Sequence, residues 1–137
     1  MRHSAALIVL AGLVFSGCGK APLEVVPELI PVSGVVLLKG KPLPKASIIF
    51  ISEEKGGVSA GRTDDLGKYT LLYAQNAAPG AVTGRHRVEI RTGGEIFDSS
   101  GKLVSETKEI LPERFNSNST LYADIGSVEQ PVNFDLR

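Results

Sequence analysis

Few side chains in this sequence of 137 residues carry the chemistry of a catalytic or metal-binding site. Cys18 is the one cysteine, and His86 is the one histidine outside the apolar N-terminal segment. A catalytic histidine needs a carboxylate to orient it or a nucleophile to activate, and the sequence marks out neither. Zinc would require further imidazole or thiolate ligands. We therefore predict that His86 is a core or rim residue, and that the protein is not an enzyme and holds no metal or other cofactor.

The adjacent carboxylates of Asp64 and Asp65, followed by Gly67, suggest calcium as one possible ligand. Calcium loops use alternating acidic positions to gather about six to eight oxygen ligands, and that alternation is absent. The same residues suit a turn, because Asp side chains accept hydrogen bonds from nearby backbone N–H groups and Gly tolerates a positive φ. We predict a capped turn.

Recognition of a carbohydrate or peptide by loops is the second kind of chemistry to consider. Sugar sites commonly use exposed aromatic rings, and the chain has no Trp. The aromatic residues expected near loops are Tyr73, Phe97, Phe115 and Tyr122. Phe97 and Tyr122 are the candidate ligand-binding residues. Phe97 is the stronger of the two, because a large apolar side chain within a polar, glycine-rich loop is unusual. The alternative, which we favour, is that Phe97 folds back and caps the core.

Cys18 directly follows a basic start and an apolar run, residues 5–15, that ends in Phe15-Ser16-Gly17. A membrane-spanning helix needs roughly 20 residues, so this shorter run is typical of the apolar region of an export signal. The arrangement resembles a bacterial lipoprotein signal, although Phe15 stands where Leu is usual. In the alternative, an ordinary secretory signal is cut near Gly17 or Gly19 and Cys18 is incidental.

The lipoprotein resemblance implies that residues 1–17 are a cleaved signal peptide and that Cys18 carries palmitate or similar acyl chains. A single acyl chain anchors a protein to a membrane only marginally, whereas two or three acyl chains give durable attachment. Prolines at positions 22 and 27 favour an extended tether over residues 18–30. We expect a protein anchored in the cell envelope, at the outer membrane or cell surface by preference, with the periplasmic side possible.

The charge balance limits the partners. The chain has 15 basic and 15 acidic residues, and without Arg2 acidic residues outnumber basic ones by one. Such a balance argues against nucleic acid or a strongly anionic membrane surface as a partner. The expected partners are the membrane, through the lipid, and other envelope proteins or glycans.

The folded domain is expected over residues 31–137. Short runs of β-branched and aromatic residues recur there, separated by Gly, Pro, Asn and Asp, as in an all-β sandwich or barrel. Strands are predicted at residues 32–38, 46–51, 57–62, 68–73, 86–91, 107–111, 121–125 and 132–136. The polar, glycine-rich residues 92–102 are expected to form an exposed loop or hairpin, and little helix is expected.

Several motifs follow one another along these strands: VSGVV at 32–36, GKPLPKASI at 40–48, TDDLGKYTL at 63–71, PG at 79–80 and RHRVEI at 85–90, with LPERFN at 111–116 and FDL at 134–136. This series resembles carboxypeptidase regulatory-like domains, which belong to the transthyretin-like (prealbumin-like) group. The resemblance covers residues 32–136 and implies a sandwich of seven or eight strands. The recurring residues have scaffold roles: Gly40 and Pro42 shape a turn, Ala46 is small where the sheets approach, and Tyr69 is a core aromatic.

The resemblance identifies a fold and not an activity, because its recurring residues have scaffold roles. We expect a non-catalytic structural or protein-binding domain. One transthyretin-like branch hydrolyses a purine-breakdown product, but it uses several histidines and ends in Tyr-Arg-Gly-Ser. The present chain ends in Asn133-Phe134-Asp135-Leu136-Arg137. A related hydrolase is therefore the least favoured alternative.

Overall fold

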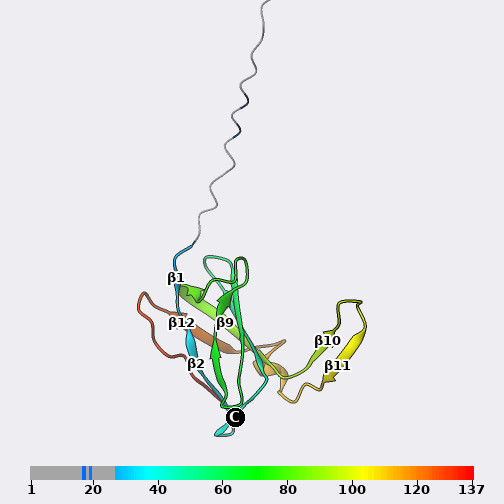
Figure 1. Cartoon of the computed structure of the whole chain (residues 1–137). Coiled ribbons are helices and arrows are strands. Elements are labelled where there is room, and N and C mark those ends of the chain that lie inside the picture. Colours follow the sequence, from blue (N-terminus) through cyan, green and yellow to red (C-terminus); the bar gives the residue numbers. More distant parts are fainter. Residues whose placement is uncertain (1–16, 18, 20–26) are drawn as a thin grey trace, which may run out of the picture.

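A computed structural model describes Gly17, Gly19 and residues 27–137, which form a layered β domain with one projecting hairpin (Figure 1). Cys18, residues 1–16 of the expected signal segment and most of the expected tether lie outside the described residues. The strands are β1 (Leu29–Ile30), β2 (Ser33–Leu38), β3 (Lys41–Pro42), β4 (Ser47–Ser52), β5 (Val58–Arg62), β6 (Lys68–Thr70), β7 (Leu72–Tyr73), β8 (Ala81–Val82), β9 (Gly84–Arg91), β10 (Gly94–Phe97), β11 (Leu103–Thr107), β12 (Leu121–Ile125) and β13 (Phe134–Leu136).

Two main sheets form the domain, as expected for an all-β sandwich. One has the strand order β12-β9-β4-β5-β7, and the other has the order β13-β2-β3 with β6 also paired to β2. All the pairs are antiparallel except β13 with β2. The parallel pair places the last strand of the chain beside the first long one.

The core follows from the alternation along each strand, because successive side chains point to opposite faces. On β9, Val88 and Ile90 are fully buried, and on β4, Ile48 and Phe50 are fully buried. Burial of each such side chain stabilises the fold by about 1.5–3 kcal/mol. Ala46 is also fully buried, as predicted for a small residue between the sheets.

The strand predicted at 68–73 is divided in two. Lys68–Thr70 pairs with β2 in one sheet, whereas Leu72–Tyr73 pairs with β5 in the other. Leu71 therefore lies where the chain passes between the sheets, and it is almost completely buried. The described residues contain thirteen strands, whereas seven or eight were expected. The number is higher because this predicted strand is divided and because several strands have only two residues.

The prediction of a strand at 107–111 is wrong. Strand β11 ends at Thr107, and the chain then turns through Glu109 toward the single-turn 3-10 helix η1 (Glu113–Phe115). The polar segment 92–102 instead supplies the first strand and the turn of the β10–β11 hairpin. Residues 103–107 supply its second strand, so the real strand begins four residues earlier than predicted.

The N-terminal part of the domain reaches slightly beyond the expected boundary at Pro31. Leu29–Ile30 pairs with Ala81–Val82, and Ile30 belongs to the buried core. Among the described residues, no helix has the length and apolar character needed to cross a membrane.

Candidate interaction surface

His86 is a core residue, as predicted. Only 1% of its surface is exposed, and its ring centroid lies 5.8 Å from that of Phe50. Its Nδ1 lies 3.0 Å from the carbonyl oxygen of Gly84. Burial lowers the pKa of His86, although the hydrogen bond to Gly84 and the nearby carboxylates of Asp124 and Glu53 oppose that change. A buried and uncharged imidazole of this kind fills space in the core.

Asp64 caps a turn, as predicted. Its Oδ1 accepts hydrogen bonds from the backbone N–H groups of Leu66 and Lys68, both at 2.9 Å. Gly67 has a φ of 74°, which closes the turn. In the described part of the chain, no group of three or more His, Cys, Asp or Glu side chains is placed to hold a metal ion.

The four aromatic residues expected near loops are placed very differently. Tyr73 and Phe115 are buried. Tyr122 is 44% exposed on β12, and the guanidinium of Arg85 lies 4.3 Å from its ring centroid. Phe97 is 54% exposed on β10, so the prediction that it caps the core is wrong. The two candidate ligand-binding residues therefore belong to different elements, Phe97 to the hairpin and Tyr122 to an edge strand of the sandwich.

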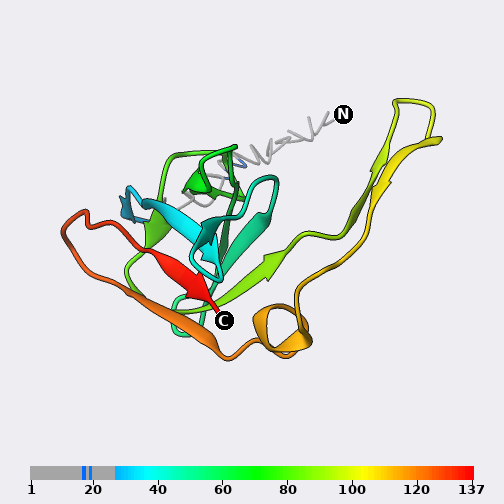
Figure 2. The same ribbon diagram turned by 90° about the horizontal axis from the view of Figure 1, so that it is seen from below.

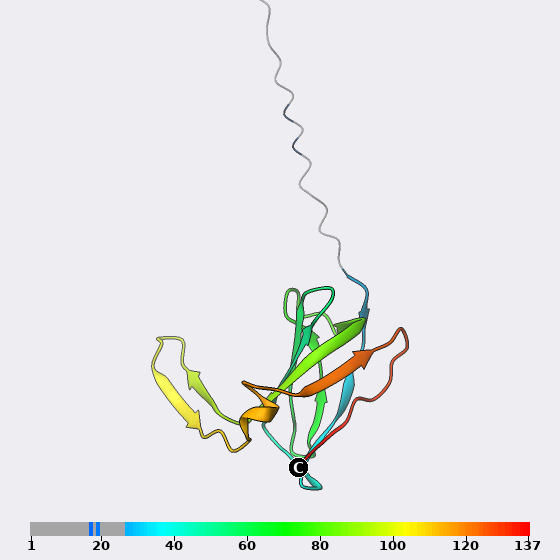
Figure 3. The ribbon, with the colours of Figure 1, turned by 180° about the vertical axis from the view of Figure 1, so that it is seen from behind.

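The β10–β11 hairpin extends away from the sandwich (Figures 2 and 3). Every residue in its two strands is exposed. Four large apolar side chains are among them: Ile96, Phe97, Leu103 and Val104. Exposed apolar surface is costly in water, so this cluster makes the hairpin the candidate interaction surface.

A hydrogen-bonded turn defines the tip of the hairpin. Asp98 Oδ1 accepts hydrogen bonds from the backbone N–H groups of Ser100 and Lys102 and from the Ser100 hydroxyl. The Ser100 hydroxyl makes the largest contribution to lowering the pKa of Asp98, followed by the Lys102 N–H. Gly101 has a φ of 83°. The segment DSSGK at 98–102 thus repeats the geometry of DDLGK at 64–68.

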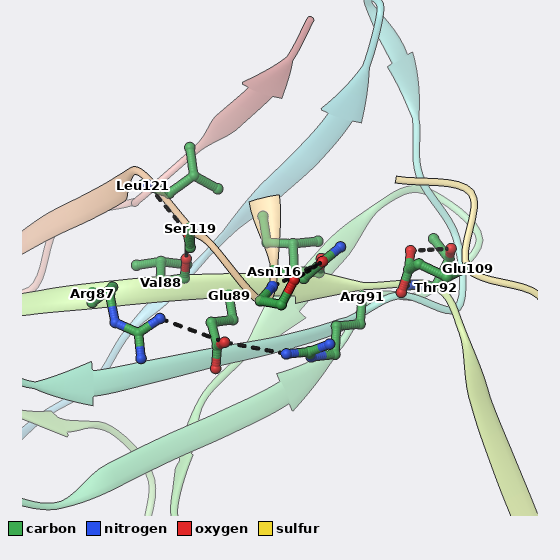
Figure 4. Close-up of polar contacts among 11 residues, drawn as sticks. Arg87, Val88, Glu89, Arg91, Thr92, Glu109, Asn116, Ser119 and Leu121 are labelled. Atoms are coloured by element: carbon green, nitrogen blue, oxygen red, sulfur yellow. Dashed lines mark hydrogen bonds and ion pairs between the residues drawn. The ribbon is translucent and has the colours of Figure 1, made fainter. Parts of the chain in front are cut away.

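The base of the hairpin is held by Glu109 (Figure 4). Its carboxylate accepts hydrogen bonds from the backbone N–H groups of Thr92, Gly93 and Leu111 at 3.0–3.2 Å. The Thr92 hydroxyl donates to Glu109 at 2.8 Å and accepts from Ile110 N–H at 2.9 Å. We call this arrangement the Glu109 clamp. Burial would raise the pKa of Glu109, but these hydrogen bonds outweigh it and the pKa lies below its ordinary value.

The returning chain is also fixed to β9 (Figure 4). The buried Ser119 hydroxyl donates to the carbonyl oxygen of Val88 and accepts from Leu121 N–H at 3.1 Å. The buried Asn116 amide donates to the carbonyl oxygen of Ile90 at 3.5 Å. Both ends of the hairpin are therefore attached to the sandwich through β9 and the segment that follows Glu109.

One face of the hairpin combines charge with apolar surface. Glu95 lies opposite Glu106, and Phe97 lies opposite Leu103. Glu95 and Phe97 are two apart on β10 and share a face, and the residue directly opposite each of them lies on the same face. A register shift between Ile96 and Phe97 accommodates the extra residue of β11, so these four side chains project to the same side. We call them the arm face. Like charges placed directly opposite each other destabilise a strand pair, so this face favours a partner that supplies positive charge.

A groove of about 540 Å³ lies elsewhere, between the β1 region and the loop that joins β12 to β13. Its walls include Pro31, Asp124, Gln130 and Asn133. Neither Phe97 nor Tyr122 lines it. The groove therefore contains neither of the aromatic residues singled out for ligand binding.

Sequence reasoning identified Phe97 but missed Ile96, Leu103, Val104 and the clamp. A signal was present, because two apolar pairs, at 96–97 and 103–104, flank a turn-forming segment. Apolar runs on both sides of such a turn predict a hairpin. The clamp had no comparable signal, since Thr92 and Glu109 are 17 residues apart and meet only when the hairpin closes.

Comparisons with known proteins identify no family. No protein-family model matches the chain, and no curated protein sequence matches it significantly. Among solved structures, a 9R-lipoxygenase from Cyanothece PCC8801 is similar over 77% of this chain and 16% of the lipoxygenase chain, with 15% identity and a TM-score of 0.42. The aligned region is thus a small part of that much longer chain.

Proposed function

We propose that this protein is a lipid-anchored component of the bacterial cell envelope that binds another protein through the β10–β11 hairpin. The observation that carries the proposal is the exposure of four large apolar side chains on an arm whose base is clamped by Glu109. A protein partner would cover this surface and contribute the hydrophobic stabilisation that the domain itself leaves unused.

The proposed anchor is Cys18, through the resemblance of residues 1–18 to a lipoprotein signal. Cys18 and Leu29 are 11 residues apart. An extended chain of that length reaches at most roughly 35–40 Å. The first strand, β1, and the hairpin lie on opposite sides of the sandwich in Figure 1. The hairpin is therefore displaced sideways from the point where the tether joins the domain, and its exposed strands are open to a partner.

The proposed role is non-catalytic, and the finer fold assignment is a carboxypeptidase regulatory-like, transthyretin-like sandwich. Support for the role comes from His86, which is buried against Phe50 and is not presented to solvent. Support for the fold assignment comes from the sequence pattern over residues 32–136 and from the two-sheet architecture. The purine-breakdown product hydrolysed by the transthyretin-like enzymes is hydroxyisourate. If the wild-type protein hydrolysed it and His86→Gln did not, the non-catalytic role would be contradicted.

The anchor is tested by labelling cells with radioactive palmitate. We expect label in the wild-type chain and none in Cys18→Ala. A matched variant, Ser16→Ala, keeps the cysteine and should retain the label. Equal labelling of the wild type and Cys18→Ala would refute lipidation at this position.

The binding surface is tested with a photo-crosslinking amino acid at position 97 in intact cells. The control carries the same group at position 66, where Leu66 is 61% exposed on a turn of the sandwich. We expect a discrete protein adduct at position 97 and none at position 66. Similar adducts at both positions would mean that the hairpin has no special role in binding.

A further inference from the structure

The outer face of the five-stranded sheet provides a second apolar surface. The side chains of Ile49, Ile51, Val58, Ala60 and Leu72 form a stripe across β4, β5 and β7, because Ile49 and Ile51 pair with Ala60 and Val58, and Ala60 pairs with Leu72. Leu72 is 47% exposed, and the other four are partly exposed. A solvated sheet face usually carries polar residues, so an apolar stripe here is unusual.

Arginines border this stripe. Arg91 and Arg62 flank Ser47 on neighbouring strands, and Arg87 pairs with Ile51. We call the stripe with Arg62, Arg87 and Arg91 the sheet face. Neighbouring strands lie about 4.8 Å apart, so the backbones of Arg62 and Arg91 are separated by roughly 10 Å.

The arginines retain unused donors. Glu89 is shared between Arg87, at 3.5 Å, and Arg91, at 3.2 Å (Figure 4). Each guanidinium has five N–H donors, of which a single shared carboxylate uses only a fraction. Arg62, Arg87 and Arg91 together with Glu89 carry a net charge of +2, which complements the −2 of Glu95 and Glu106 on the arm face.

Among the described residues, no ion pair joins the arm face to the sheet face of its own molecule. All the strand residues of the hairpin are exposed, and the Glu109 clamp holds the hairpin away from the sandwich (Figure 3). Glu95 and Ile96 do line a small hollow of about 140 Å³ with Lys45 and Arg62, but no ion pair joins Glu95 to Arg62 among the described residues.

We infer that the partner of the hairpin is a second copy of this chain, with the arm face of each molecule lying on the sheet face of the other. Phe97 and Leu103 would cover the apolar stripe, and Glu95 and Glu106 would meet Arg62 and Arg91. The same two surfaces meet twice in a two-fold dimer, so the arrangement closes without leaving an unpaired arm. This inference depends on the proposed function, because it names the protein that the hairpin binds.

Two further properties favour a second copy. Without the expected signal segment, and so without Arg2, acidic residues outnumber basic ones by only one, so two copies repel each other little at long range. Copies anchored in one membrane also share a thin layer, which raises their effective concentration.

The test exchanges charges between the two faces of the full chain in detergent. One variant, Glu95→Arg with Glu106→Arg, makes both faces positive. The other, Arg62→Glu with Arg91→Glu, makes both faces negative. We expect dimers for the wild type, at least tenfold weaker self-association for each variant, and restored dimers when the two variants are mixed. Light scattering measures the mass, and circular dichroism confirms that each variant is folded.

A matched control, Lys41→Glu with Glu129→Arg, changes two exposed charges outside both faces and should remain dimeric. A monomeric wild type, or variants that dimerise as strongly as the wild type, would overturn the inference. A monomer whose position 97 still crosslinks to a different protein would leave the proposed function standing. Absence of any adduct at position 97 would count against both proposals.

Discussion

Removing the Glu109 carboxylate is expected to free the base of the hairpin without unfolding the sandwich. The carboxylate accepts from four donors: the N–H groups of Thr92, Gly93 and Leu111 and the Thr92 hydroxyl. A hydrogen bond to a charged group contributes about 1.5–3 kcal/mol, and solvent at this partly exposed site replaces much of that. We therefore expect Glu109→Ala to cost about 1–2 kcal/mol of local stability, which corresponds to a roughly 5–30-fold change in the opening equilibrium.

Amide hydrogen exchange measures this change directly. Exchange at Thr92, Gly93 and Leu111 should accelerate by that factor in Glu109→Ala, while Val88 in the sandwich keeps its protection. Glu129→Ala removes an exposed carboxylate that makes no hydrogen bond within the described part of the chain, and it should leave all these rates unchanged. Unchanged exchange at the three amides in Glu109→Ala would refute the clamp.

The clamp should also weaken in acid. Because the pKa of Glu109 is lower in the folded protein than its ordinary value of 4.5, its contribution is complete above that value and is lost as the pH falls through the folded pKa. Exchange at Gly93 should therefore accelerate below about pH 4.5 beyond the intrinsic pH dependence of amide exchange. The extra acceleration should be absent in Glu109→Gln.

Three further predictions concern the sandwich. Gly34→Ala places a Cβ 1.8 Å from the carbonyl oxygen of Val132, so the free energy of unfolding measured in urea should fall by about 1–3 kcal/mol or more. The control Gly94→Ala has open space around the new Cβ and should leave the free energy of unfolding unchanged. Tyr69→Phe removes the hydroxyl that donates to the same carbonyl at 2.5 Å and should cost about 1 kcal/mol, and an unchanged urea midpoint would contradict this. Because burial lowers the pKa of His86 from 6.5, thermal stability should fall as the pH decreases below that value, and His86→Phe should lack that part of the pH dependence.

The local features of the fold were predictable where short-range chemistry dominates. The prediction of a strand at 86–91 is confirmed by β9, and Asp64 with Gly67 predicted the turn that the structure contains. The strand at 68–73 was predicted as continuous because its alternation has no break. Its division at Leu71 depends on which sheet each half joins, and that is decided by distant strands.

For the candidate surface too, some features depend on residues that are near in sequence and others on contacts between residues that are far apart. The sequence alone determined that the chain is an all-β domain and that Phe97 sits in a polar, turn-rich segment, because periodicity and turn residues are local properties. Only the tertiary structure decided that Phe97 points to solvent and not to the core. The cause is the contact between Thr92 and Glu109, which are distant in sequence and fix the direction of the hairpin. Whether an apolar side chain on an excursion is buried depends on that direction, and no local pattern encodes it.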